Sequence, residues 1–273
     1  MAKRIQSPSS INTFKQCMRK YYYQYIECLP TLPNIHQVRG NIAHSTLENF
    51  YTIDVSQFNE ENYTQKFSSS LQQLFLHQWK QYLPKLQSLH LHPDQERFYF
   101  EETMLMLMNW GKHFLEDLKQ LRTKKNISIA EAFLLLTPIR EQEMSSQEWS
   151  VRGFIDAIHQ FDDEVHIIDY KTNSSFEMKD SMVLQLAIYS LLYSEKHGKM
   201  PDKVGIFFLR QKLKMMKVEK EHLELAKKEI AAIHEHTSKT EDKKDYKCSP
   251  SPLCKWSSGQ CDFYETCKPF AKG

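Results

Sequence analysis

Three charged residues lie within or at the end of apolar runs in the segment 153–172, GFIDAIHQFDDEVHIIDYKT. Asp156 belongs to the first run, and Asp169 and Lys171 close the second. One explanation is that all three face water at strand ends, because isolated charged residues are mostly exposed. The other is a shared metal site, since two carboxylates on adjacent strands repel each other unless a cation lies between them.

The geometry of a predicted hairpin brings the three side chains together. Side chains alternate along a strand, so Asp169 and Lys171 share one face of the predicted strand 164–172. A turn at 162–163 then places Asp156 near Asp169 on the neighbouring strand. Beside a divalent ion, the Lys171 ammonium could hold a water nucleophile or stabilise charge on a phosphate. This is a functional geometry for the hydrolysis of phosphodiester bonds.

The elements that must position these residues follow from the hydrophobic period. Three consecutive strands are expected where the helical period gives way to alternation. The expected strands cover residues 127–137, 148–160 and 164–172. A helix at 181–196, a buried strand at 203–210 and a charged amphipathic helix at 218–236 follow. This order predicts a mixed α/β fold.

Two helices are expected near the N-terminus. Ser7 suits an N-cap and Pro8 suits the first helical position, so a helix should start there and end at Pro30. A second amphipathic helix should follow Gly40 and carry His44. A lone histidine on such a helix is more often structural or exposed than a ligand, so its role depends on its neighbours.

The segment 55–125 is interpreted as a helical insertion in a single domain that covers residues 1–273. Its pattern is helical from residue 60, with breaks at Pro84 and Pro93. No linker-like segment bounds it, which argues against a separate domain. A chain of 273 residues with 41% hydrophobic residues is long enough to bury a large core.

The charge and hydropathy of the chain exclude few functions. The net charge is +2, and a near-neutral total can hide the basic patch of a nucleic-acid binder. No run of about 18 apolar residues occurs, so neither a transmembrane helix nor a membrane partner is expected. The N-terminus lacks the apolar stretch of a secretory signal, so we expect a cytoplasmic protein.

Six cysteines are unevenly placed along the chain. They are Cys17 and Cys28 near the N-terminus and Cys248, Cys254, Cys261 and Cys267 near the C-terminus. In a cytoplasmic chain this placement argues against a disulfide framework. Cys17 and the last three cysteines give four thiolates, enough for a 4Fe–4S cluster and equally for a structural Zn²⁺. Cys248 offers another fourth ligand, unligated cysteines are the third alternative, and Cys28 is expected to be a small buried residue.

The segments GFIDAI and IIDYKT together resemble the core of the PD-(D/E)XK nuclease superfamily, in particular its RecB-like and CRISPR-adaptation-type exonuclease branch. Three further segments agree, in the family order. HSTLENFY resembles the helix that supplies a metal-binding histidine, here His44, and QLAIYSLLY matches the Q-x-x-x-Y motif at Gln185 and Tyr189. SPSSINTFKQCMRKYYYQYI resembles the N-terminal segment of the iron–sulfur members, with Cys17 as the first cysteine.

The resemblance implies a restriction-endonuclease-like mixed sheet flanked by helices, with a role for each matching residue. Asp156 and Asp169 would bind Mg²⁺ or Mn²⁺, His44 would complete the metal shell, and Lys171 would be the catalytic lysine.

The supporting motif lies on the helix at 181–196. Gln185 and Tyr189 are four residues apart and so share one helical face, which in the family turns to the active site and the DNA. Glu131, in the predicted first strand, matches a recurrent acidic position, and we assign it no catalytic role.

The resemblance extends to the tail 246–273. Its last three cysteines would bind a 4Fe–4S cluster together with Cys17 and so close the tail on the N-terminal helix. The chain departs from the family pattern in two places. Six residues separate Cys254 from Cys261, where the family commonly has two, and Met18 replaces the proline that usually follows the first cysteine. Zinc is therefore kept as the alternative.

Together these implications describe a metal-dependent DNA exonuclease that prefers single strands or free ends and serves DNA repair, recombination or CRISPR adaptation. One alternative is an inactive nuclease-fold module that binds DNA, which the filled aspartate, lysine and glutamine positions oppose. The other is a zinc-stabilised RNA-processing protein, which the lack of recognisable RNA motifs opposes.

Two segments are candidates for contacts with DNA. The tyrosines at 21–23, together with Tyr189, could stack on unpaired bases, although the tyrosine run also fits the core face of its helix. The basic segment 210–217, RQKLKMMK, could contact phosphates, and a solvated hairpin is the alternative.

Overall fold

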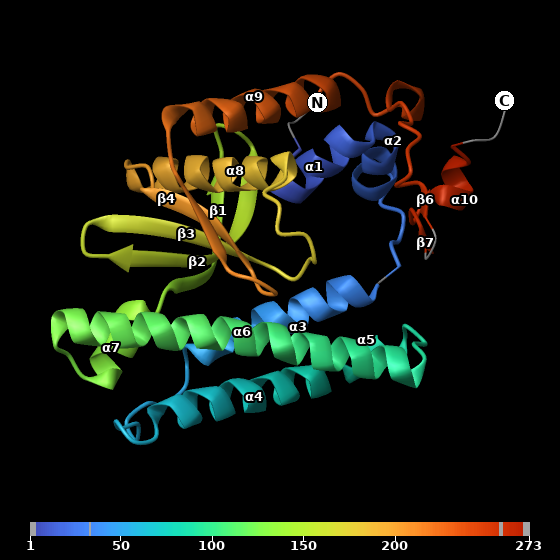
Figure 1. Cartoon of the computed structure of the whole chain (residues 1–273). Helices are drawn as coiled ribbons and strands as arrows, with labels where there is room; N and C mark the ends of the chain where they lie inside the picture. Colours follow the sequence, from blue (N-terminus) through green and yellow to red (C-terminus); the bar gives the residue numbers. More distant parts are fainter. Residues whose placement is uncertain (1–3, 33, 257–258, 270–273) are drawn as a thin grey trace.

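The computed structural model describes residues 4–32, 34–256 and 259–269, which fold around a five-stranded mixed sheet (Figure 1). The strand order is β1-β2-β3-β4-β5; β3 and β4 pair parallel, and the other pairs are antiparallel. The strands are β1 (Ile139–Ser146), β2 (Val151–Phe161), β3 (Glu164–Lys171), β4 (Lys203–Phe208) and β5 (Leu213–Lys217). The predicted restriction-endonuclease-like α/β fold, a mixed sheet flanked by helices, is confirmed.

Helices cover both faces of the sheet (Figure 1). One face carries α1 (Pro8–Gln16), α8 (Asp180–His197) and α9 (Lys220–Thr237). The other carries α3 (Ile35–Phe50), α4 (Tyr63–Gln81), α5 (Leu83–Gln87), α6 (Pro93–Lys125) and α7 (Ile129–Leu136). Each face has its own cluster of buried side chains, with Ile167 in the first cluster and Ile168 in the second. The alternation of β3 therefore separates two cores.

The central elements follow the sequence prediction. The turn at 162–163 joins β2 to β3, with Phe161 paired to Glu164. The helices predicted at 181–196 and 218–236 are α8 and α9, with small shifts at their ends, and the predicted strand at 203–210 contains β4.

The first helix starts as predicted but is not continuous. Ser7 caps α1 by accepting a hydrogen bond from the Ser10 amide. Cys17 then interrupts the helix with an extended backbone, φ −162° and ψ 111°. The chain continues as α2 (Met18–Tyr21) and a π-helical turn η1 (Tyr22–Ile26).

The tyrosine run of this segment packs inward. Tyr21 and Tyr23 are buried, and so is Tyr189 of α8. These three rings are core residues rather than platforms for stacking on bases.

The second helix begins earlier than predicted. Asn34 caps α3 by accepting a hydrogen bond from the Gln37 amide, so Gly40 lies inside the helix. A Cβ at Gly40 would meet Thr172 Oγ1 at 3.9 Å, an ordinary contact, so the glycine marks no boundary. His44 therefore lies well within α3.

The strand predicted at 127–137 is wrong, because this segment forms α7. Ser128 and Glu131 build a capping box in which each side chain bonds the amide of the other. Glu131 is thus an exposed helix-capping residue outside the sheet. The first strand is β1, which follows α7 and reads IREQEMSS.

The segment 55–125 forms α4, α5 and α6, with Pro84 and Pro93 in the first turns of α5 and α6. Trp110 of α6 belongs to the same buried cluster as Tyr170 of β3, so these helices and the sheet share one core. In the described part of the chain, no helix combines the length and the apolar character needed to cross a membrane.

The tail follows α9 through the 3-10 turn η2 (Lys243–Asp245). Its remaining elements are the short strands β6 (Lys255–Trp256) and β7 (Gly259–Gln260) and the helix α10 (Tyr264–Cys267).

Candidate active site

Three metal-ligand side chains from α3, β1 and β2 lie together. His44 Nδ1 is 3.2 Å from Asp156 Oδ1 and 4.0 Å from Glu141 Oε1. One ligand atom of each residue lies within 4.8 Å of the other two, and the described residues hold no other such group of three. One imidazole and two carboxylates suit a divalent cation such as Mn²⁺ or Mg²⁺.

Glu141 escapes the sequence reasoning because the wrong segment is taken as the first strand. It adopts a left-handed backbone, φ 45°, between the registered pairs Arg140–Ala157 and Gln142–Ile155. The β1–β2 register is the same on both sides of Glu141, so no residue is inserted, and the left-handed backbone is local strain of the kind that clusters at active sites. The capping box before 129–136 is the signal that would have assigned α7 and moved the first strand to β1.

The regular alternation of side chains between the two faces of the sheet is interrupted in β2 at Asp156. Ile155 and Ile158 pack in the same buried cluster, whereas strict alternation would place them on opposite faces, and Ala157 packs in the other cluster. Asp156 Oδ2 accepts a hydrogen bond from the Tyr170 amide at 2.7 Å, next to the end of the registered β2–β3 ladder. This bond fixes the carboxylate and satisfies a buried backbone donor.

Asp169 is joined to the two other predicted catalytic positions. Lys171 Nζ lies 2.7 Å from Asp169 Oδ2, and Gln185 Nε2 donates to Asp169 Oδ1 at 2.8 Å. The same amide nitrogen also contacts the Tyr189 hydroxyl at 2.8 Å. The structure therefore places Asp169 with Lys171 and Gln185, beside the group of His44, Glu141 and Asp156 rather than in it.

Gly153 of β2 leaves space for Tyr189, the tyrosine of the Q-x-x-x-Y motif on α8. A Cβ at Gly153 would meet Tyr189 Cε1 at 2.9 Å, closer than real Cβ contacts allow. The glycine of GFID therefore lets α8 approach β2, which brings Gln185 within reach of Asp169.

The backbone of Tyr170 orients the histidine. His44 Nε2 is 3.0 Å from the Tyr170 carbonyl oxygen, which can only accept, so Nε2 carries the proton. Nδ1 is then the atom directed at the carboxylates. Metal-bound histidines commonly use one nitrogen in this way and anchor the other.

The electrostatics of the site fit a bound cation. Burial and the charge of Asp156 raise the pKa of Glu141 to about 7. Burial raises the pKa of Asp169 to about 6 against the opposing charge of Lys171, and Asp156 adds to the increase. Burial alone would lower the pKa of His44, but Asp156 outweighs it and raises this pKa to about 9. A divalent cation would relieve the repulsion among these carboxylates, so the donor set fits such an ion.

A partly buried cluster of two arginines and one glutamate contacts Thr172, the residue that follows Lys171. Arg39 of α3 and Arg210 both form ion pairs with Glu102 of α6. The Thr172 carbonyl accepts from Arg39 at 3.5 Å and from Arg210 at 3.3 Å. The cluster thus connects α6 to the backbone beside Lys171.

The basic segment 210–217 forms the end of a hairpin. β4 and β5 pair antiparallel, and Arg210 lies in the turn between them, held by Glu102. Lys214 donates to the Phe176 carbonyl oxygen at 2.7 Å. These two cations therefore have internal partners.

Five of the six cysteines line one cavity of about 910 Å³, and they come from both ends of the chain. They are Cys17, Cys248, Cys254, Cys261 and Cys267. The sulfur atoms of Cys248 and Cys267 are 3.4 Å apart. Arg19 contacts the tail through its backbone amide, which donates to Lys247 at 3.1 Å. The remaining cysteine, Cys28, is exposed, so the prediction that it is buried is wrong.

The distances between the cysteine sulfur atoms limit which cofactor they can bind together. Four thiolates around one zinc would lie about 3.8 Å apart, since Zn–S bonds are about 2.3 Å long. Among the described residues, no three cysteine sulfurs lie within 4.8 Å of one another. The described sulfurs therefore form no set as close as a zinc site requires.

One family model matches most of this chain. The model of the PD-(D/E)XK nuclease superfamily matches residues 6–268. A crystal structure from Eubacterium rectale that carries the name "Putative exonuclease" is 11% identical, with a TM-score of 0.46 over 92% of this chain and 86% of that chain. A search of curated proteins finds no match. The family match extends over nearly the whole chain, and the chain belongs to the PD-(D/E)XK nuclease superfamily.

Proposed function

We propose that this nuclease is a Mg²⁺- or Mn²⁺-dependent deoxyribonuclease that acts as an exonuclease on single-stranded DNA or free DNA ends. The observation that carries the proposal is the placement of the ligand group of His44, Glu141 and Asp156 beside the pair of Asp169 and Lys171. The preference for single strands, the RecB-like branch, the cytoplasmic location and a role in repair, recombination or CRISPR adaptation rest on the sequence resemblance.

Each residue of the site has a defined task in this proposal. His44, Glu141 and Asp156 would hold the cation, with Asp169 as the further ligand that the resemblance implies. When bound, the cation activates a water molecule and neutralises charge on the phosphate. The Lys171 ammonium stabilises the negative charge that develops on the phosphate oxygens. Gln185 keeps Asp169 in place through its amide.

We also propose that the tail holds a 4Fe–4S cluster through Cys17, Cys254, Cys261 and Cys267, with Zn²⁺ as the alternative. Support comes from the cavity that these cysteines share. The cluster would connect the tail to Cys17, whose extended backbone separates α1 from α2. It has no part in the chemical step.

The test is digestion of end-labelled single- and double-stranded DNA with Mg²⁺, Mn²⁺ or a chelator. We expect metal-dependent release of mononucleotides or short products, faster from single strands. Asp169→Ala and Lys171→Ala should abolish cleavage, while Lys228→Ala, at an exposed position of α9, should retain it. No cleavage by the wild-type chain, or full cleavage by both site variants, contradicts the proposal.

A further inference from the structure

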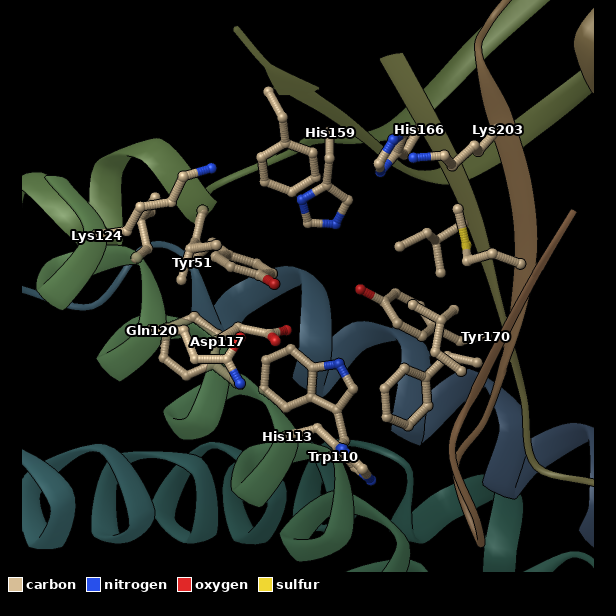
Figure 2. Close-up of a pocket in the computed structure, with 18 residues that line it drawn as sticks. Tyr51, Trp110, His113, Asp117, Gln120, Lys124, His159, His166, Tyr170 and Lys203 are labelled. Atoms are coloured by element: carbon tan, nitrogen blue, oxygen red, sulfur yellow. The ribbon is translucent and has the colours of Figure 1, made fainter. Parts of the chain in front are cut away.

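A second cavity, of about 630 Å³, lies between α6 and the face of the sheet that carries Tyr170 (Figure 2). A separate, small pocket is lined by His44, Glu141 and Asp156. Tyr51 and Tyr170 line both, so these two tyrosines form a shared wall between the ligand group and the larger cavity. The larger cavity has no role in the proposed chemistry.

The walls of this cavity are rich in aromatic side chains. They include Tyr51, Trp110, Phe114, Phe161, Tyr170 and Phe207. Aromatic walls favour a planar ring, which can stack on or pack edge-on against them. The volume is within the range of sites that bind small organic molecules.

Polar groups point into this aromatic space. Figure 2 shows the hydroxyls of Tyr51 and Tyr170 directed toward each other, with the carboxylate of Asp117 beside them. The ring of His159 also points inward; the residue is 8% exposed, and its Nδ1 has no hydrogen-bond partner. Because an unpaired buried polar atom is costly, His159 Nδ1 favours a ligand with a hydrogen-bonding edge.

Cationic side chains lie where the cavity opens to solvent. Lys124 at the end of α6 is exposed, and Lys203 of β4 has 41% of its side chain exposed. Lys203 shares Glu164 with His166, so Lys124 is the better placed to meet an anion. An anionic group would therefore lie at this opening, beside Lys124.

We propose that this cavity binds a nucleotide, with the base among the aromatic walls and the phosphate at Lys124 and Lys203. The ionised Asp117 carboxylate only accepts hydrogen bonds, so it suits the donor edge of a base, either an exocyclic amino group or a ring N–H. A fatty acid would give Asp117 no donor, and a neutral aromatic compound would leave both lysines unused. A nucleotide offers both an aromatic base for the walls and an anion for the two lysines.

The nucleotide has two sources with the same chemistry. It is either a free nucleoside monophosphate or the terminal residue of a DNA strand whose neighbouring phosphate lies at the ligand group. Only the second source rests on the proposed nuclease function. The shared wall of Tyr51 and Tyr170 places either one next to the site.

The test uses the full chain with Lys171→Ala and without divalent ions, so that nothing is turned over. Calorimetric titrations with dAMP, dTMP, deoxyadenosine and inorganic phosphate measure binding. We expect dAMP and dTMP, whose bases both carry an N–H donor, to bind about tenfold more tightly than deoxyadenosine, which lacks the phosphate, or inorganic phosphate, which lacks the base. Adding Asp117→Ala or Lys124→Ala should each weaken dAMP binding by about tenfold. Lys112→Ala is the matched control, since this exposed lysine of α6 does not line the cavity.

Failure of dAMP to bind the folded chain overturns the proposal. An affinity for dAMP that is unchanged by both Asp117→Ala and Lys124→Ala also overturns it. A single-stranded oligonucleotide that displaces dAMP supports the strand terminus as the source, whereas joint binding supports a free nucleotide. Because these titrations need no cleavage, a wild-type chain without nuclease activity leaves the result interpretable.

Discussion

Glu141 and Asp156 face each other across β1 and β2 at the one position where both strands lose their regular geometry. Glu141 has a left-handed backbone, φ 45°, and Asp156 bonds the Tyr170 amide in place of a regular ladder contact. The distortion turns both carboxylates toward His44. Strain of this kind persists where the surroundings fix it and often serves function.

Replacing Glu141 should weaken metal binding without unfolding the chain. Glu141→Gln keeps the size of the side chain but removes one charged ligand, so we expect the Kd for Mn²⁺ to rise at least about tenfold. Titration followed by electron paramagnetic resonance measures it. Glu143→Gln is the matched control, because Glu143 lies in the same strand and half of its side chain is exposed. An unchanged Mn²⁺ affinity in Glu141→Gln would remove Glu141 from the ligand set.

The predictable part of this site is local in sequence. The alternation of IIDYKT and the turn at 162–163 are enough to bring Asp169 and Lys171 to one face. Periodicity likewise finds α8, which carries Gln185. These features depend on residues that are close together in the sequence, so the hydrophobic pattern of the sequence is enough to predict them.

The unpredictable part depends on contacts between distant elements. Glu102 lies 63 residues from Arg39 and 108 residues from Arg210, and no local pattern links them. Local pattern does not find Glu141, because the apolar run IAEAFLLL is a stronger strand signal than the polar sequence of β1. The fold stabilises β1 through its pairing with β2. Tertiary context overrides local propensity in such strands.

Two glycine substitutions should change stability in opposite directions. Gly153→Ala places a Cβ 2.9 Å from the Tyr189 ring, so we expect a loss of about 1–3 kcal/mol in the free energy of unfolding. Gly40→Ala meets only an ordinary contact inside α3 and should add up to about 1 kcal/mol. Urea denaturation measures both. Equal effects of the two changes would contradict the close approach of α8 to β2.

Removing the glutamate between the two arginines should affect both stability and turnover. Glu102→Gln leaves Arg39, whose side chain is 2% exposed, without its charged partner, so we expect a loss of about 2 kcal/mol. The Thr172 carbonyl also loses its support, so kcat should fall more than KM changes. Glu101→Gln, an exposed neighbour paired with Arg97, should change stability by less than about 0.5 kcal/mol. Identical behaviour of the two variants would exclude the connection to Lys171.

The buried histidine of β2 should make stability depend on pH. Burial lowers the pKa of His159 from 6.5 to about 4, so below pH 6.5 the unfolded chain binds a proton that the folded chain does not. Stability therefore falls as the pH drops from 6.5 toward 4. Relative to His159→Gln, the wild-type chain should lose about 2 kcal/mol between pH 7 and pH 5 and nothing between pH 8 and pH 7. A pH-independent difference between the two chains would show that His159 keeps its ordinary pKa.

The cysteine cavity predicts which substitutions remove the cofactor. Cys17→Ser and Cys267→Ser should each abolish the visible absorption of the anaerobically purified chain and most of its iron, because each removes one of the four proposed ligands. Cys28→Ser is the matched control, since Cys28 is exposed and lies outside the cavity. Cys248 is the discriminating position, because its sulfur is 3.4 Å from that of Cys267 without belonging to the proposed set. Iron retained in Cys248→Ser and lost in Cys254→Ser supports the proposed set, and the reverse assigns Cys248 in place of Cys254. A colourless wild-type chain with one equivalent of zinc would replace the cluster by a zinc site.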